Sequence, residues 1–355
     1  MEPEFAPVYF YIPQDQLSGH LPESPDQYWP WRTRHTRRER FLGKFDWTLQ
    51  TYLHLKRAGF SCELTTGSPS SGILVAHKDF LDDFPRPGPA TFLVCLKSDR
   101  PPHTSAQMHV VQNPCDKVHL YRAQYADSYF IPHWIQPLLQ GRDPRRKDRF
   151  ETAGYVGCDI ELSPEFKTPA WSRRVQTLGM GWEMITDAEQ WAKYDQLDVV
   201  VAVRRCHAKG DAFHHKPATK LYNAWHAGVP AILGNESAYL AEKKSDLDYI
   251  AADSPDDVFD ALKRLHQDVD LRRRMTENGK QRAVETRPEA LCRQWVRLFT
   301  EVVPPHYHRW CRSGLSRRGY LARCAIGRRL SRTKSLLAGM KRAVAALPLG
   351  KAIGS

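Results

Sequence analysis

The residues with the greatest capacity for chemistry lie between Arg204 and Tyr239, where cationic and polar side chains surround a short helical pattern. The segment follows the β-branched run Asp198 to Val203, so it starts at the carboxyl end of an expected strand. Pro217 suits the first turn of the next helix, whose free N–H groups and positive dipole end would face an anion. The side chains expected to bind this ligand are Arg204, Lys216, Thr219, Lys220, Asn223, Asn235, Glu236 and Ser237.

Fixed cations and backbone donors of this kind suit a diphosphate. Lys220 and Arg204 would neutralise the charge that grows on a departing diphosphate. Glu236, in the loop after the next strand, would accept hydrogen bonds from ribose or sugar hydroxyls. The alternative interpretation is a helix of a plain Rossmann-like domain beside a solvated basic loop.

Two runs of alternating strand and helix patterns position this segment. The first extends from a strand at Val8 to Ile12 to one at Ser128 to Ile131, and the second from Gly154 to Cys158 onward. We expect helices at Phe45 to Ala58 and Asp187 to Tyr194. The aromatic and arginine-rich stretch Gln14 to Lys44 could form an acceptor platform, a membrane-facing edge or a solvated charged loop. The predicted units are a Rossmann-like domain (1–140), a linker (141–152), a second Rossmann-like domain (153–305) and a basic amphipathic tail (306–355).

Such alternation predicts the α/β class, with two doubly wound sheets of parallel strands facing a cleft. Ligands of doubly wound sheets bind beyond the carboxyl ends of the strands, so the cleft is the expected active site. A catalytic base from the first domain would then follow one of its strands. The candidates are His77 and Asp99, with Asp15 and His20 as further possibilities, and Arg100 could hold an anionic acceptor group.

The run Lys216-Pro-Ala-Thr-Lys-Leu-Tyr-Asn-Ala-Trp-His-Ala-Gly-Val-Pro-Ala-Ile-Leu resembles the donor-binding region of GT-B glycosyltransferases. Many retaining members carry a glutamate, seven residues and a second glutamate before the Gly-x-Pro. Here His215 and Asn223 occupy the two glutamate positions, so the ribose contact and the stereochemical class do not carry over. The resemblance implies that the second domain binds a nucleotide sugar, that the first binds the acceptor, and that no metal or other cofactor is needed. It also implies that the helix Pro288 to Val303 returns to the first domain.

The net charge of +12 belongs to the tail. Residues 306–355 contain twelve Lys or Arg and no Asp or Glu, whereas the other 305 residues hold 40 basic and 40 acidic side chains. Apolar residues recur between these cations at nearly helical steps, as in helices that bind an anionic membrane surface. An unstructured tail or a nucleic-acid-binding tail would have a similar charge, but the tail has few aromatic residues for stacking on bases.

These features predict a glycosyltransferase that moves a sugar from a nucleotide-sugar donor to a hydroxyl of a glycan or lipid-linked acceptor, in surface polysaccharide or glycolipid synthesis. The N-terminus has no apolar signal segment, so we expect a cytoplasmic enzyme, peripheral on the inner face of the membrane. The motifs GxGxxG, GxxxxGK[ST], HExxH and GxSxG are absent. The alternatives are another enzyme on this fold, such as a sugar-nucleotide epimerase, or a non-catalytic protein that binds membrane or nucleic acid through its tail.

Overall fold

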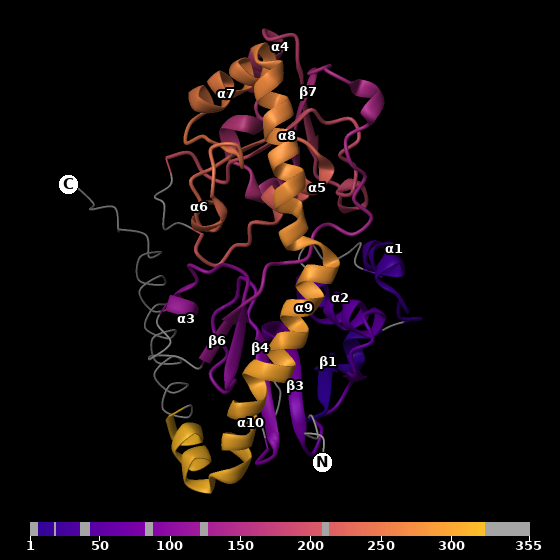
Figure 1. Cartoon of the computed structure of the whole chain (residues 1–355), viewed down its shortest axis with the longest axis vertical. Coiled ribbons are helices and arrows are strands. Elements are labelled where there is room, and N and C mark those ends of the chain that lie inside the picture. Colours follow the sequence, from indigo (N-terminus) through magenta and orange to yellow (C-terminus); the bar gives the residue numbers. More distant parts are fainter. Residues whose placement is uncertain are drawn as a thin grey trace, which may run out of the picture.

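The computed structural model contains two parallel β-sheets, one in each half of the chain (Figure 1). It describes residues 6–17, 19–35, 43–81, 88–120, 127–207 and 213–323. The first sheet has the order β2-β1-β3-β4-β5-β6 and the second has the order β11-β10-β9-β7-β8. Every strand pairing is parallel. Two parallel α/β sheets facing a cleft are the arrangement that the sequence predicts, and the fold class is confirmed.

The strands of the first sheet are short and largely buried. They are β1 (Val8–Tyr11), β2 (Glu63–Thr65), β3 (Gly72–His77), β4 (Thr91–Leu96), β5 (Met108–Val111) and β6 (Asp127–Phe130). Alternate residues of β3 enter different cores, since Ile73 packs with one cluster and Leu74 with another. Burial on both faces is the reason that these strands read as continuous apolar runs.

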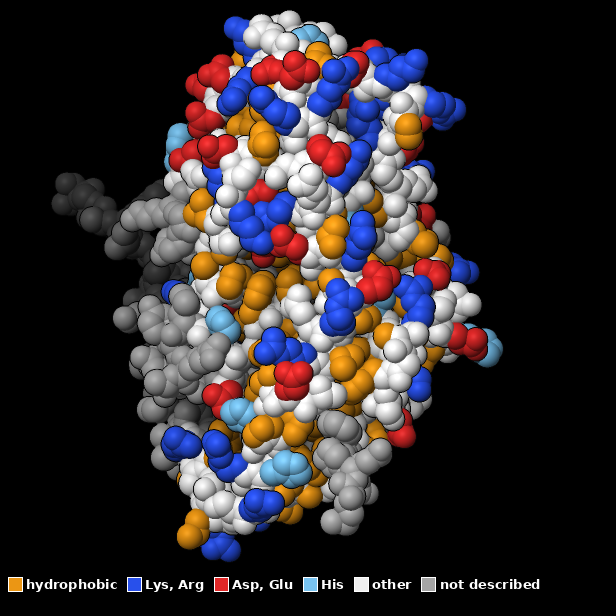
Figure 2. Space-filling view, in the orientation of Figure 1, with side chains coloured by type: hydrophobic (Ala, Val, Ile, Leu, Met, Phe, Trp, Pro, Cys, Tyr) orange, Lys and Arg blue, Asp and Glu red, His pale blue; other side chains and the backbone are white. Residues whose placement is uncertain are grey.

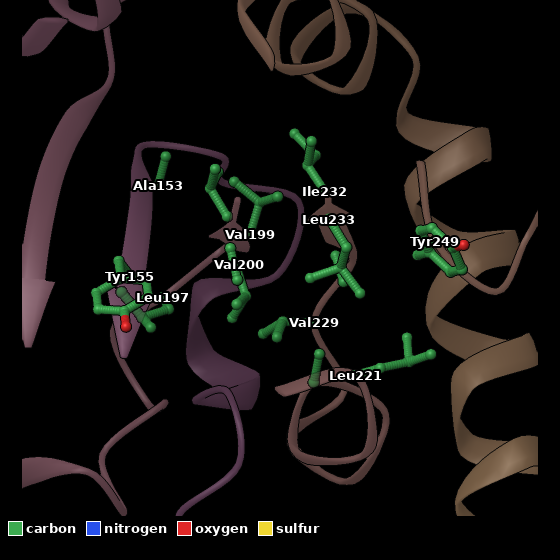
Figure 3. Close-up of a cluster of buried hydrophobic side chains, with 14 of the residues drawn as sticks. Ala153, Tyr155, Leu197, Val199, Val200, Leu221, Val229, Ile232, Leu233 and Tyr249 are labelled. Atoms are coloured by element: carbon green, nitrogen blue, oxygen red, sulfur yellow. The ribbon is translucent and has the colours of Figure 1, made fainter. Parts of the chain in front are cut away.

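The second sheet is built in the same way, and Figure 3 shows part of its core. Its strands are β7 (Thr152–Val156), β8 (Gly181–Ile185), β9 (Val199–Ala202), β10 (Ala231–Leu233) and β11 (Ile250–Ala251). The helices of this domain are α4 (Pro169–Gln176), α5 (Thr219–Ala227), α6 (Ser237–Glu242), α7 (Pro255–Gln267) and α8 (Val269–Ala283). Ser254 caps α7 by accepting a hydrogen bond from the backbone N–H of Asp257, as its sequence predicts.

The chain returns to the first domain after α8. Helix α9 (Pro288–Arg297), a π-helical turn (Leu298–Val302) and α10 (Val303–Arg312) run down the front of the lower half of the molecule in Figure 1. Trp295 and Phe299 pack in the core of the first domain, where Trp295 lies 6.1 Å from the Trp47 ring of α2 (Gly43–Arg57). The expected return of the final helix is therefore observed.

The aromatic and arginine-rich stretch contains helix α1 (Pro25–His35), whose inner face buries Tyr28 and Trp29. One local prediction is wrong. The expected helix Asp187 to Tyr194 is only a 3₁₀ turn, Ala188–Gln190. The backbone groups of Ala192 and Tyr194 bond instead to Gln140, which pulls this segment into an extended pairing with the linker.

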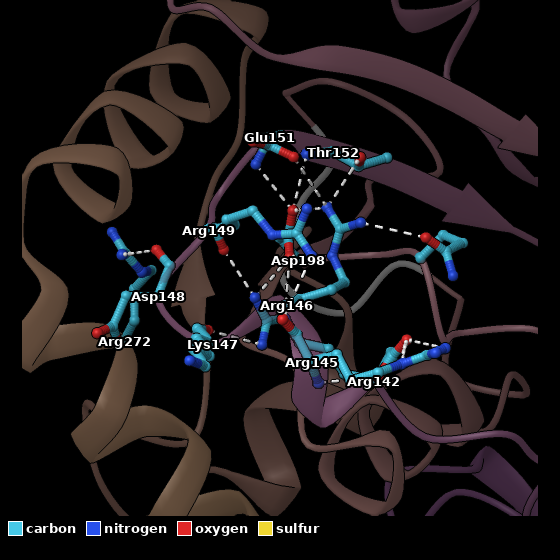
Figure 4. A network of polar contacts seen from close by, with 12 residues as sticks. Arg142, Arg145, Arg146, Lys147, Asp148, Arg149, Glu151, Thr152, Asp198 and Arg272 are labelled. Atoms are coloured by element: carbon cyan, nitrogen blue, oxygen red, sulfur yellow. Dashed lines mark hydrogen bonds and ion pairs between the residues drawn. The ribbon is translucent and has the colours of Figure 1, made fainter.

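The linker is fastened to the second domain through Asp198 (Figure 4). Its carboxylate lies 2.7 Å from Arg142 and 2.6 Å from Arg146, and it accepts hydrogen bonds from the backbone N–H groups of Glu151 and Thr152. The carboxylate is fully buried. A segment that looked irregular in sequence is thus held by a dense network of ionic hydrogen bonds.

Charges of both signs intermingle over the face of the body shown in Figure 2, in keeping with the balanced charge of residues 1–305. Of the predicted tail, the structure describes residues 306–323, and residues 324–355 lie outside the described part. Within the described residues, no helix is both long enough and apolar enough to span a bilayer.

Candidate active site

A cavity of about 290 Å³ lies between the domains, where the carboxyl ends of strands from both sheets meet. The first domain contributes His77 at the end of β3 and Ser98 and Asp99 after β4. The second domain contributes Gly157 after β7 and Arg204 after β9. This is the edge at which doubly wound sheets bind ligands.

The N-terminus of α5 opens on the cavity. Pro217, Thr219 and Lys220 all line it, and no side chain caps the helix. The first backbone N–H groups of a helix have no partner within the helix and carry partial positive charge. The Thr219 hydroxyl is also buried without a hydrogen-bond partner. An anionic group placed here would meet unused donors.

Lys220 lines this wall and has no acidic partner among the residues that the structure describes. No ion pair or hydrogen bond joins it to another described residue, and its ammonium lies 5.0 Å from the centroid of the Tyr155 ring. Burial, with the nearby charge of Arg204, lowers the pKa of Lys220 to about 7. A bound anion would reverse this shift, because an opposite charge favours the ammonium form.

Gly157 brings the backbone close to the same ammonium. Its φ of +141° is a conformation that L side chains rarely adopt. A Cβ at this position would lie 2.7 Å from Lys220 Nζ. The backbone conformation therefore favours glycine here, and a side chain at this position would also displace the Lys220 ammonium.

Arg204 is held by two carboxylates. Its guanidinium lies 2.5 Å from Glu161 and also pairs with Glu236, and its side chain is only 9% exposed. Lys216 bridges the domains, at 2.9 Å from Glu161 and 2.9 Å from Asp99. Although burial opposes the shift, Arg204 and Lys216 lower the pKa of Glu161 to about 2, so this carboxylate is ionised at neutral pH.

The structure thus divides the predicted donor-binding residues. Arg204, Lys216, Thr219, Lys220 and Asn223 line the cavity. Asn235, Glu236 and Ser237 are not in its wall. Glu236 faces Arg204, and the Ser237 hydroxyl accepts a hydrogen bond from Asn113 of the first domain at 3.0 Å.

Asn223 performs a structural task in addition to lining the cavity. Its Oδ1 accepts a hydrogen bond from the backbone N–H of Gln136 at 2.9 Å. This bond ties the start of the interdomain linker to α5, one turn beyond Lys220.

The candidate bases of the first domain are also separated. His77 and Asp99 line the cavity together with Arg100, which pairs with Asp79 at 2.8 Å. Asp15 and His20 are exposed and lie outside the cavity wall. Although burial opposes the shift, Lys216 holds the pKa of Asp99 below its usual value, which makes Asp99 a weak proton acceptor.

Sequence reasoning missed Glu161, which organises the cations, and His133, which lines the cavity from the segment after β6. Glu161 lies in a short 3₁₀ turn just after β7. Its place beyond the end of an expected strand was a usable signal. His133 follows the expected strand Ser128 to Ile131 by two residues, so the same signal applied to it.

No cluster of three or more potential metal ligands occurs within the ranges that the structure describes. The sequence contains two Asp-x-Asp motifs, at positions 246–248 and 268–270. Neither lies in the cavity: Asp248 is buried beside Arg282, and Asp268 caps α8.

No protein-family model and no curated protein matches the sequence. Solved structures do resemble it. HepE of Anabaena in complex with UDP and glucose is 9% identical over 84% of this chain and 100% of that chain, with a TM-score of 0.49. Sucrose-phosphate synthase of Thermosynechococcus elongatus is 13% identical over 74% of this chain and 78% of that chain, with a TM-score of 0.45. The pneumococcal O-GlcNAc transferase GtfA in complex with UDP and GlcNAc is 13% identical over 70% of this chain, with a TM-score of 0.47, and this chain spans 59% of it. The fold assignment itself depends on the two parallel sheets described above.

Proposed function

We propose that the chain is a glycosyltransferase that uses a nucleotide-sugar donor. The observation that carries the proposal is Lys220, at the N-terminus of a helix that opens on the interdomain cavity, where its ammonium has no acidic partner among the described residues. Gly157 lets the backbone of the opposite turn approach the same point. Together these groups can bind a diphosphate without a metal ion and stabilise it as it leaves.

The proposed donor site comprises the N-terminus of α5 with Thr219 and Lys220, and Lys216 at its rim. Glu161 and Glu236 already occupy both sides of the Arg204 guanidinium. Arg204 would therefore act on the donor indirectly, through these two carboxylates. The acceptor, a hydroxyl of a glycan or a lipid-linked glycan, would enter from the first domain between His77 and Asp99.

Thermal unfolding with a panel of nucleosides, nucleoside diphosphates and nucleotide sugars tests the donor site. A ligand that binds only the native state adds about 2.7 kcal/mol of stability at a hundredfold excess over its Kd. We expect diphosphates of one base to raise the Tm and the matching nucleoside to leave it unchanged. If no diphosphate raises the Tm, the donor site does not exist.

We also propose that the chain works as a peripheral protein on the cytoplasmic face of a membrane. The described part of the tail supports this, because Trp310 bonds to the backbone of Gly88 and anchors α10 to the first domain. Beyond it, Leu315 is 83% exposed among basic side chains. The exposed cations of this surface are Arg309, Arg312, Arg318 and Arg323.

Sedimentation with vesicles tests this surface. Each cation near an anionic bilayer contributes about 1 kcal/mol. Replacing Arg309, Arg312 and Arg318 by glutamine should therefore weaken binding to phosphatidylglycerol vesicles on the order of 100-fold. The same change at Lys263, Arg264 and Arg274, elsewhere on the surface, should have little effect. Equal binding to vesicles of neutral phosphatidylcholine would count against an electrostatic membrane contact.

A further inference from the structure

His133 lies three residues after β6, in the segment that leads to the linker, and is half-buried in the wall of the cavity. Its ring packs edge-on against Trp47 at 5.0 Å, with an interplanar angle of 89°. Trp47 is itself fixed, because its indole N–H donates to Gln112 at 3.1 Å. The orientation of the His133 ring is therefore set by packing.

The hydrogen bond of His133 defines which ring nitrogen carries the proton. Nδ1 lies 2.7 Å from the carbonyl oxygen of Trp134. A carbonyl can only accept, so Nδ1 must donate and hold the proton of the neutral ring. The lone pair is then on Nε2, and no other described residue forms a hydrogen bond with that atom.

His77 has the opposite arrangement. Its Nδ1 accepts a hydrogen bond from the backbone N–H of Asp79 at 3.1 Å. The proton of the neutral ring is therefore on Nε2, which is buried without a partner. Nε2 of His77 could only donate, and the ring could take up a second proton only by breaking its bond to Asp79. Burial lowers the pKa of His77 to about 4, in agreement with this cost.

The position of His133 is coupled to the donor site. Gln136, three residues after His133, bonds to Asn223, and Asn223 lies three residues after Lys220 on α5. The same helix thus presents Lys220 to the cavity and holds the segment that carries His133. A nucleophile activated by His133 would approach a donor bound at Lys220.

We propose that His133 is the catalytic base of the transfer and that the reaction inverts the anomeric configuration. This inference rests on the proposed function. The proton of the acceptor hydroxyl moves to Nε2 of His133, and the hydroxyl oxygen forms the bond to the anomeric carbon. The bond from that carbon to the diphosphate oxygen breaks, and the diphosphate leaves with the electron pair, beside Lys220.

The surroundings of His133 fit a base. Burial lowers the pKa of its ring, so the ring is neutral and has its lone pair available at neutral pH. The facing charges are Asp46, which favours the imidazolium, and Arg32, which opposes it. Asp46 is shared with Arg32 at 2.6 Å and with the Tyr28 hydroxyl. Proton uptake on Nε2 leaves the bond from Nδ1 to Trp134 intact.

The proposal is tested by measuring the rate at which the enzyme hydrolyses the nucleotide sugar that raises its Tm. Water is then the acceptor, and the donor is present at a saturating concentration. We expect release of nucleoside diphosphate to fall as the pH drops below the pKa of His133, and to fall again as Lys220 loses its proton. His133→Asn keeps a donor that can reach the Trp134 carbonyl but has no Nε2. This substitution should lower the rate about 100-fold or more and abolish the fall in rate at low pH. It should change the affinity for the donor less than twofold. His266→Asn, the same change outside the cavity, should have none of these effects.

The anomeric configuration of the released sugar distinguishes a catalytic from a structural role of His133. A base at His133 requires that this configuration be inverted, and NMR can record it before the sugar mutarotates. Three outcomes would overturn the proposal. The released sugar could retain the anomeric configuration, or the wild type could bind the donor without hydrolysing it at any pH. The fall in rate at low pH could also persist in His133→Asn. Imidazole should restore part of the rate of His133→Ala. Failure of the proposed function itself would look different, since no nucleotide sugar would then raise the Tm of the wild type.

Discussion

Replacing Lys220 by alanine is expected to lower the rate of donor cleavage by 100-fold to 1,000-fold. An ammonium that stabilises a leaving diphosphate inside a partly buried site makes a contribution of this size to the transition state. The two neighbouring cations that the structure describes on this wall, Arg204 and Lys216, are both held by Glu161 and cannot readily take its place. Affinity for the nucleotide sugar should fall less, by about 10-fold to 100-fold, as for other hydrogen bonds to charged groups.

The loss should depend on charge and not on volume. Lys220→Met fills similar space without a charge, and it should behave like Lys220→Ala. Lys263→Ala, on the exposed face of α7, is the matched control and should leave kcat and donor affinity unchanged. If Lys220→Ala keeps donor affinity and kcat within twofold of the wild type, the assignment of the donor site is wrong.

The same lysine predicts a pH dependence of binding. Its pKa in the empty cavity is about 7 and should rise when an anionic diphosphate binds. Affinity is then fully present below pH 7 and falls above it, by up to about tenfold per pH unit, until the pKa of the complex is reached. A nucleotide sugar suits this measurement because its diphosphate does not titrate near neutral pH. Calorimetry in buffers of different ionisation enthalpy should show proton uptake at pH 8 in the wild type and none in Lys220→Met.

Asp198 governs the largest expected change in stability. The buried carboxylate is shared by Arg142, Arg146 and two backbone N–H groups. Asp198→Ala would leave two guanidinium groups and these donors without their partner, which costs about 3–5 kcal/mol. Asp198→Asn should also destabilise the chain, because it removes the charge and turns an amide N–H₂ toward donors. The free energy of unfolding in urea measures both, and Asp260→Ala on the surface of α7 should change it by less than about 0.5 kcal/mol.

Low pH should remove the contribution of the Asp198 carboxylate to the free energy of unfolding. Although burial opposes the shift, hydrogen bonds from Arg146 and from the backbone of Glu151 and Thr152 lower the pKa of Asp198. A carboxylate whose folded pKa is depressed stabilises the protein above its unfolded pKa, near 3.9, and this contribution is lost as the pH falls through the folded pKa. The difference in stability between the wild type and Asp198→Ala should therefore be constant from pH 7 to pH 5 and shrink in strong acid. A difference that does not change down to pH 2 would contradict this account.

Much of the architecture is legible in the sequence. The apolar β-branched runs predict the parallel strands, because strands buried on both faces have no polar alternation. The Gly-Val-Pro after α5 and the cations before it predict the helix and the sheet edge at which it begins. Lys216, Thr219 and Lys220 lie at the cavity for this local reason: they are close in sequence to a strand end and a helix start.

The sequence by itself determined the class of fold, the edge of the sheets at which the cavity lies and several of the cations that line it. Only the tertiary structure decided which of these cations remain available. Glu161 comes from another strand end, 43 residues before Arg204, and Asp99 lies 117 residues before Lys216. Their pairing depends on how two sheets face each other, and periodicity along one chain does not encode that distance. The same holds for His133, whose proton is placed by a single backbone carbonyl and whose position follows from the bond between the linker and α5.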